Sequence, residues 1–356
     1  MEEVLETKED SNKIFENYYF LGGIFLVVLI IIGLFVFYHP PEKTVSIQNC
    51  GDGTFSNYCS LTKPYFCQNE TLIQNVTQCG CPDSAKFSNG TCVSEYNKNG
   101  TLMSFNYLLN GKNDSLNFEL YPAVLPYLLN LTRTKLYYNG ELPRRDDFKL
   151  SKINDPVQDD YLSSLAVEIE NLAPNSKDMQ AKIAVSLVQN IPYNESQFET
   201  VLGTKVRLAR YPYQVLLENQ GSCEGKSELL TYLLRKMGFG VMLFYFPPED
   251  HESVGIKCPL EYSYKGTGYC FVETTVSSPI SFSDGEYLGV SGISKLVSQP
   301  QFVLMSDGIS LSGNLEDYED AKTLSGLVDQ ISETGSLNPL DNVKMNSLRK
   351  KYNLTF

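Results

Sequence analysis

The sequence predicts an α+β protein in which one helix packs on an antiparallel sheet. An apolar face at helical spacing runs from Leu229 to Met237, and Gly238 ends it. Apolar segments of strand length follow this helix, at 239–246, 251–257 and 269–275. Because a helix precedes a run of strands, without alternation of strands and helices, the α+β class is favoured over a parallel α/β sheet.

Composition excludes several classes of function. The 356 residues carry a net charge of −13, and 42% of them are apolar, as in an ordinary globular protein of two or three domains. The acidic balance argues against binding of nucleic acid, which requires a clustered basic surface. The chain has two histidines, His39 and His251, and no calcium loop of the D-x-D-x-D-G type. We therefore expect no metal and no cofactor.

An apolar segment near the N-terminus predicts a membrane anchor. Residues 19–38 contain no charged side chain and are long enough to cross about 30 Å of hydrocarbon as a helix. Tyr18, Tyr19 and Tyr38 flank the segment, as aromatic residues do at membrane interfaces. A cleaved signal peptide is the alternative, but the apolar stretch is long, its leader is acidic, and no A-x-A-like site follows. We expect an uncleaved single helix after a cytoplasmic tail at 1–18.

Six cysteines cluster in residues 44–93, a segment that is also rich in Asn, Thr, Gly and Pro. Their spacing contains no C-x-x-C pair, so a zinc ribbon is not favoured. An even number of cysteines in a small segment with few core residues is typical of a disulfide-stapled module, and the sequence leaves its connectivity open. The cysteines are Cys50, Cys59, Cys67, Cys79, Cys81 and Cys92.

Eight N-x-S/T sequons lie on the same side of the anchor. Together they are typical of an exported, glycosylated domain, so we expect the residues after His39 to be extracellular and the N-terminus to be inside the cell. The sequons begin at Asn69, Asn75, Asn89, Asn99, Asn113, Asn130, Asn194 and Asn353.

Other elements can be predicted along the chain. A hairpin is expected around Asn110-Gly111, and residues 144–156, which are charged and end at a proline, are expected to form a linker. Helices are expected at 123–131, 160–172, 176–189, 315–331 and 339–352.

The triplet Gly225-Lys226-Ser227 resembles the end of a phosphate-binding loop. That motif requires a glycine five residues before Gly225, where this sequence has Gln220, and no clear strand precedes it. A nucleotide site is therefore not expected here.

Allocation of the cysteines leaves Cys223 without a partner. Cys258 and Cys270 flank a glycine-containing loop and can form a local disulfide. An odd cysteine in an exported protein indicates either pairing between chains or a reactive thiol. Cys223 stands at the predicted N-terminus of a helix, where unsatisfied N–H groups favour the thiolate, which is the nucleophilic form.

His251 is the histidine available to activate this thiol, because His39 abuts the membrane. An imidazole in such a role needs a group that orients its other nitrogen, and Glu273 on the next strand can accept that hydrogen bond. His251 and Glu273 share one face of the predicted antiparallel pair, whereas Cys258 and Cys270 share the other. Both pairs cannot lie directly opposite in one regular register. We expect the register that places His251 opposite Glu273.

The stretch from about Asp178 to Thr275 resembles the transglutaminase-like superfamily. The resemblance is carried by QNIPY at 189–193, by RYPYQVLLENQGSCEGKSELLTYLLRKMGFGVMLFYF at 210–246, and by the later segments HESVGIK and FVETT. It implies a papain-like α+β core with Cys223 as nucleophile, His251 as general base and Glu273 as acidic third member. The chemistry implied is acyl transfer through a thioester: cross-linking, deamidation or peptide hydrolysis.

The whole chain resembles membrane-anchored prokaryotic members of this superfamily, of archaeal type. The resemblance divides the ectodomain into the Cys-rich segment at 44–93, a transglutaminase-like domain at 94–300 and a helical extension at 301–356. Three departures matter. Glu273 stands where many relatives have Asp, and Ser222 and Gly225 stand where relatives often carry acidic residues. The absence of tryptophan removes the indole that some members use as oxyanion donor. The backbone N–H of Cys223 with the side chain of Gln214 or Gln220 is the substitute we predict.

Two functions remain open at this point. The first is a membrane-anchored extracellular thiol enzyme that acts on a protein or peptide substrate. The second is a non-catalytic binding or structural ectodomain on a degenerate fold of the same kind. The sequence specifies neither the substrate nor the oligomeric state.

Overall fold

The computed structural model describes residues 26–30, 49–133, 144–195, 197–201, 203–283, 286–289 and 292–355. Residues 1–47 and 48–356 form two separate units. Within the described residues no helix has the length and apolar character needed to span a membrane. The predicted anchor at 19–38 lies outside the described residues except for 26–30, which are helical.

The Cys-rich segment is stapled by three disulfides, as predicted, and their connectivity is now given. The pairs are Cys50–Cys67, Cys59–Cys79 and Cys81–Cys92. The segment contains five short elements: β1 (Tyr65–Gln68), β2 (Thr71–Gln74), α2 (Val76–Cys79), β3 (Lys86–Ser88) and β4 (Thr91–Val93). It is attached to the rest of the unit through Asn171, whose side chain accepts a hydrogen bond from the Leu72 amide and donates one to the Leu72 carbonyl.

The predicted hairpin is confirmed and is longer than expected. It consists of β5 (Thr101–Leu109) and β6 (Lys112–Leu120), with Asn110 and Gly111 in the turn. Both turn residues have positive φ, at 51° and 75°, which the sequence Asn-Gly adopts readily. A second hairpin, which the sequence analysis missed, is formed by β7 (Gln197–Val201) and β8 (Thr204–Leu208).

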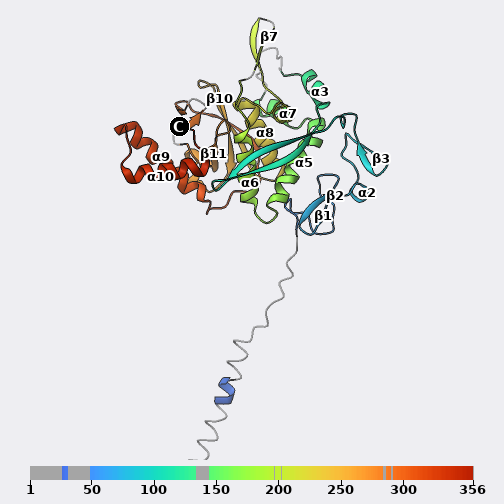
Figure 1. The fold of residues 1–356 in the computed structure, drawn as a ribbon, viewed down its shortest axis with the longest axis horizontal. Helices are drawn as coiled ribbons and strands as arrows, with labels where there is room; N and C mark the ends of the chain where they lie inside the picture. The colour runs from blue at the N-terminus through green and yellow to red at the C-terminus, as the bar shows by residue number, and fades with distance from the viewer. Residues whose placement is uncertain are drawn as a thin grey trace, which may run out of the picture. The chain divides into compact units, whose positions relative to one another are not determined.

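Helices surround α8 (Cys223–Lys236), which carries the predicted nucleophile. Figure 1 shows α8 in the middle of the unit, with α5 on one side and strands β10 and β11 on the other. The other helices before the sheet are α3 (Val124–Asn130), α4 (Arg145–Ile153), α5 (Pro156–Leu172), α6 (Lys177–Asn190) and α7 (Pro212–Glu218). The linker predicted at 144–156 is wrong, because these residues form α4 and the start of α5.

The main sheet is antiparallel, with strand order β11-β10-β9-β14. Its strands are β9 (Val241–Phe246), β10 (His251–Lys257), β11 (Tyr269–Val272) and β14 (Gln301–Ser306). Leu229 and Leu233 of α8 are fully buried in one core cluster with Leu243 of β9 and Val254 of β10. The α+β class with a helix packed on an antiparallel sheet is therefore confirmed.

The C-terminal region begins inside this sheet. β14 pairs with β9, so residues 301–306 belong to the core sheet and the helical part of the predicted extension starts later. The remaining elements are two 3₁₀ turns, η1 (Leu260–Tyr262) and η2 (Tyr264–Gly266), the hairpin β12 (Glu286–Gly289) and β13 (Gly292–Lys295), and helices α9 (Glu316–Thr334) and α10 (Pro339–Tyr352).

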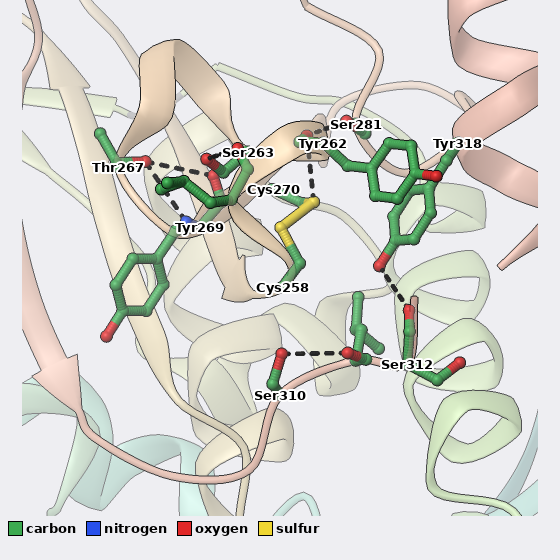
Figure 2. Close-up of a disulfide and its surroundings, with 12 residues drawn as sticks. Cys258, Tyr262, Ser263, Thr267, Tyr269, Cys270, Ser281, Ser310, Ser312 and Tyr318 are labelled. Carbon is green, nitrogen blue, oxygen red and sulfur yellow. Dashed lines mark hydrogen bonds between the residues drawn. A yellow bond between two sulfur atoms is a disulfide. The ribbon is translucent and has the colours of Figure 1, made fainter. Parts of the chain in front are cut away.

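A fourth disulfide, Cys258–Cys270, closes the loop between β10 and β11 as predicted. Figure 2 shows Tyr262 of this loop stacked on Tyr318 of α9, with ring centroids 4.1 Å apart. Ser281 donates a hydrogen bond to the Tyr262 carbonyl. The loop therefore joins the sheet to the C-terminal helices.

The cysteine pairing makes a direct prediction. Eight of the nine cysteines are in disulfides and Cys223 is free. Thiol titration of the unfolded, unreduced chain should give one thiol per chain, and the Cys223→Ala variant should give none. More than one thiol in the parent chain would contradict this pairing.

Candidate active site

Cys223 is the first residue of α8, as predicted. The helix starts here because the Ser222 side chain caps it, accepting a hydrogen bond from the Gly225 amide. The Cys223 side chain is 5% exposed, and its Sγ lies 3.8 Å from the carbonyl oxygen of Asp250. The free thiol is thus held against the residue that precedes His251.

His251 is the first residue of β10, and its ring lies between the thiol and a carboxylate. Its Nε2 is 2.9 Å from Oε2 of Glu273, and its side chain is also hydrogen-bonded to Cys223. Since Nε2 faces Glu273, Nδ1 is the ring nitrogen that remains for the thiol. Burial lowers the pKa of His251, but the Glu273 carboxylate and Cys223 outweigh it and raise that pKa well above its ordinary value.

Glu273 follows β11 directly and is fixed by its own neighbours. Its Oε1 accepts hydrogen bonds from the amides of Thr274 and Thr275, at 2.9 and 2.7 Å, and from the Thr275 hydroxyl, at 2.6 Å. Glu273 is 1% exposed. Burial raises the pKa of Glu273, but His251 and these hydrogen bonds lower it below its ordinary value, so the carboxylate is ionised. It can therefore orient His251 and stabilise its charged form.

The predicted register between the two strands is wrong. Val254 pairs with Val272, so His251 and Glu273 are diagonal neighbours rather than directly opposite. Ile256 pairs with Cys270, which makes Cys258 and Cys270 diagonal as well. Diagonal residues on one face lie about 7–8 Å apart at Cα and remain within reach of long side chains. The long side chains of His251 and Glu273 therefore meet across the diagonal, whereas Cys258 lies just beyond the end of β10, where its Cα is 5.7 Å from that of Cys270.

The two glutamines predicted as oxyanion donors both bind Glu218. The Gln214 amide donates to Glu218 at 2.6 Å and accepts from Arg133 at 2.9 Å. The Gln220 amide donates to Glu218 at 3.3 Å and accepts from Asn194 at 2.9 Å. The first amide N–H groups of a helix have no partner within that helix, so the helix itself does not use the backbone N–H of Cys223.

A buried charge network lies against the site and was missed by the sequence analysis. Lys149 of α4 contacts three carboxylates: Glu224 at 2.6 Å, Glu228 at 2.8 Å and Glu252 at 3.0 Å. Glu224 follows Cys223 and Glu252 follows His251, so one ammonium group joins the helix that carries the thiol to the strand that carries the imidazole. In the sequence this network is indicated only by the lysines of a charged segment and by three glutamates that follow much later in the chain.

The β7–β8 hairpin also reaches the site. Arg207 forms an ion pair with Asp250, the residue before His251. Burial lowers the pKa of Arg207, but Asp250 and Cys223 outweigh it and raise that pKa. On the partner strand, Phe198 lies opposite Arg207 and is exposed. The hairpin therefore places a cationic and aromatic surface beside the thiol.

The predicted glycosylation sites lie on accessible positions. Seven of the eight asparagines are exposed and Asn75, which caps α2, is half-buried. Among the residues that the structure describes, no group of three or more His, Cys, Asp or Glu side chains is arranged to hold a metal ion.

Fold and site together define an α+β protein with a buried cysteine–histidine–glutamate constellation at the junction of a helix and a sheet. No protein-family model, no curated protein and no solved structure matches this chain.

Proposed function

We propose that this protein is a membrane-anchored extracellular thiol enzyme that acts on peptide or glutamine amides through a thioester. The observation that supports it most is the placement of His251, whose Nε2 is 2.9 Å from Oε2 of Glu273 and whose pKa is raised by both Glu273 and Cys223. This is the arrangement of an activated nucleophile with an oriented base. The resemblance to the transglutaminase-like superfamily assigns the same roles to the same three residues.

The reaction would proceed in two halves. Cys223 gives its proton to His251 and attacks the amide carbonyl carbon, forming a C–S bond. His251 returns the proton to the leaving amine as the C–N bond breaks, which leaves a thioester. Water or a primary amine then attacks the thioester, His251 takes its proton, and the thiolate leaves. Water gives hydrolysis or deamidation, whereas an amine gives a cross-link.

The extracellular location rests on the disulfides and on the sequence of the N-terminal segment. Four disulfides are typical of proteins from oxidising compartments. The apolar residues 19–38 supply the proposed single-pass anchor, with residues 1–18 inside the cell.

The proposal is tested by product mass. The full chain is incubated with a glutamine-containing peptide, with and without a primary amine, and the products are analysed by mass spectrometry. We expect a deamidated or cleaved peptide without the amine, or an amine adduct with it, and none of these with the Cys223→Ala variant. Products that persist in that variant would assign the activity to another group or to a contaminant.

The burial of the site favours a second candidate, a non-catalytic binding ectodomain. Cys223 and His251 are each only 5% exposed. Alkylation separates the two candidates, because an enzyme must admit reagents to its nucleophile. If iodoacetamide modifies Cys223 only after the chain is unfolded, and no amide product forms, the binding ectodomain is the correct assignment.

A further inference from the structure

Lys226, in the triplet that resembles a phosphate-binding loop, is fully buried one turn after Cys223. Its Nζ donates to three backbone carbonyls: those of Ile191 at 2.6 Å, Gln189 at 3.2 Å and Thr275 at 3.2 Å. Burial lowers the pKa of Lys226 to about 7, although Glu273 raises it, and the three carbonyl acceptors match the three N–H donors of the ammonium form. The side chain therefore joins α8 to the end of α6 and to the segment that follows β11.

Thr275 supplies two of the three hydrogen bonds that Oε1 of Glu273 accepts from Thr274 and Thr275. Its amide and its hydroxyl both donate to Oε1 of Glu273, and its carbonyl accepts from Lys226. Gln189, whose carbonyl also accepts from Lys226, donates through its side chain to the carbonyl of Glu273, at 2.8 Å. Lys226 thus contacts Thr275, which binds the Glu273 carboxylate, and Gln189, which binds the Glu273 backbone carbonyl.

The next residue of the helix makes parallel contacts. Oγ of Ser227 donates to the carbonyl of Glu252, the residue after His251, at 3.0 Å. It also lies 3.0 Å from the hydroxyl of Thr274, the residue after Glu273. Lys226 and Ser227 are consecutive residues of α8. Together they bind the segment that follows the base, His251, and the segment that follows the acid, Glu273.

The path of the Lys226 side chain depends on Gly221. A Cβ atom at position 221 would lie 2.9 Å from Cγ of Lys226 and 3.2 Å from a methyl group of Val215. Only glycine at position 221 leaves the Lys226 side chain in its observed position. The backbone before Cys223 therefore provides the space for that side chain.

We propose that Lys226 is a positioning residue of the catalytic triad: it holds Thr275, and through Thr275 the Glu273 carboxylate, against the His251 ring. This inference rests on the function proposed above, and it gives the Gly225-Lys226-Ser227 triplet a role that does not involve phosphate.

The titration of His251 tests this role without any need for turnover. In a full-length chain that carries His39→Asn, His251 is the sole histidine, so its imidazole signals can be followed by NMR in detergent. We expect the Lys226→Met variant to lower the titration midpoint of His251 by about one pH unit or more, because a displaced carboxylate stabilises the imidazolium less. The Lys236→Met variant, at a partly exposed lysine of the same helix, should leave the midpoint unchanged.

The sign of the shift separates positioning from a simple charge effect. Removal of a nearby positive charge, with the carboxylate still in place, would raise the midpoint of His251. A rise, or no change, overturns the proposal.

If Lys226→Met does not fold, Gly221→Ala carries the test, because it keeps the lysine but displaces its stem. A smaller fall in the midpoint is expected there, and no change in that folded variant overturns the proposal as well. If the parent chain yields no amide product but the variants show the expected fall in the His251 midpoint, the proposed activity is refuted and the positioning role of Lys226 is retained.

Discussion

Replacing His251 with alanine should reduce amide turnover by roughly 10²–10⁴-fold, the range that a positioned general acid–base group contributes. The ring is the group placed to take the proton of Cys223 and to return it to the leaving amine, and Glu273 supplies the negative charge that stabilises its protonated form. Turnover is measured by product mass with the glutamine peptide. The matched control is His39→Ala, the same substitution at the other histidine, which should retain the activity of the parent chain.

Alkylation of Cys223 gives an independent measure of the same prediction. The raised pKa of His251 keeps the imidazolium form populated well above the ordinary pKa of histidine, so the parent chain should react with iodoacetamide from mildly acidic to alkaline pH. In His251→Ala the reaction should be confined to alkaline pH, as for an ordinary thiol. Identical pH profiles for the two chains would refute the pairing of Cys223 with His251.

The strand register explains why the side-chain length of the acidic residue at position 273 matters. In the observed register His251 and Glu273 are diagonal neighbours, and Oε1 of Glu273 is already held by Thr274 and Thr275. An aspartate is one methylene shorter, so it cannot keep these donors and also reach His251 across the diagonal. Glu273, which stands where many transglutaminase-like proteins have aspartate, is therefore matched to the strand register of this chain.

The sequence predicted the site better than its surroundings, and the reasons are physical. Counting cysteines isolated Cys223, and the scarcity of histidine isolated His251, because both arguments depend on composition and chain order alone. The register was mispredicted because facing pairs were assumed to be directly opposite, whereas a long side chain also acts diagonally. The alternation of residues along a strand specifies the face of the sheet on which each residue lies. It does not specify which residue of the neighbouring strand is its partner.

Helix α4 shows the limit of such reasoning. The segment around Lys149 is charged and ends at a proline, a pattern typical of an exposed linker. Its lysines are buried because their partners, Glu224, Glu228 and Glu252, come from a helix and a strand that are remote in the sequence. The glutamates at 224 and 228 lie on one helix face, next to the leucine face, and this was the one local sign of a buried charged surface.

This network leads to the largest expected effect on stability. Replacing Lys149 with methionine should lower the free energy of unfolding by about 3–5 kcal/mol, the usual cost of removing one partner from a buried ion pair. Lys149 is 1% exposed, and its loss leaves Glu224, Glu228 and Glu252 close together with less positive charge between them. Urea unfolding of the full chain measures the change. Lys322→Met, at an exposed position of α9, should change stability by no more than about 0.5 kcal/mol.

The pH dependence of this effect identifies its origin. The neighbouring Lys149 lowers the pKa of Glu224 to about 2 although burial raises it, so the carboxylate stabilises the folded parent chain at pH values above its ordinary pKa of 4.5. That contribution disappears as the pH falls from 4.5 to about 2. The deficit of Lys149→Met should therefore be largest near neutral pH and should shrink below pH 4.5, where the Glu224 contribution to the stability of the parent chain disappears. Adding Glu224→Gln should recover part of the loss at neutral pH, because it removes the charge that Lys149 neutralised. A deficit that is constant with pH, and is not relieved by this second change, would trace the effect to lost packing of the lysine stem instead of to the buried charges.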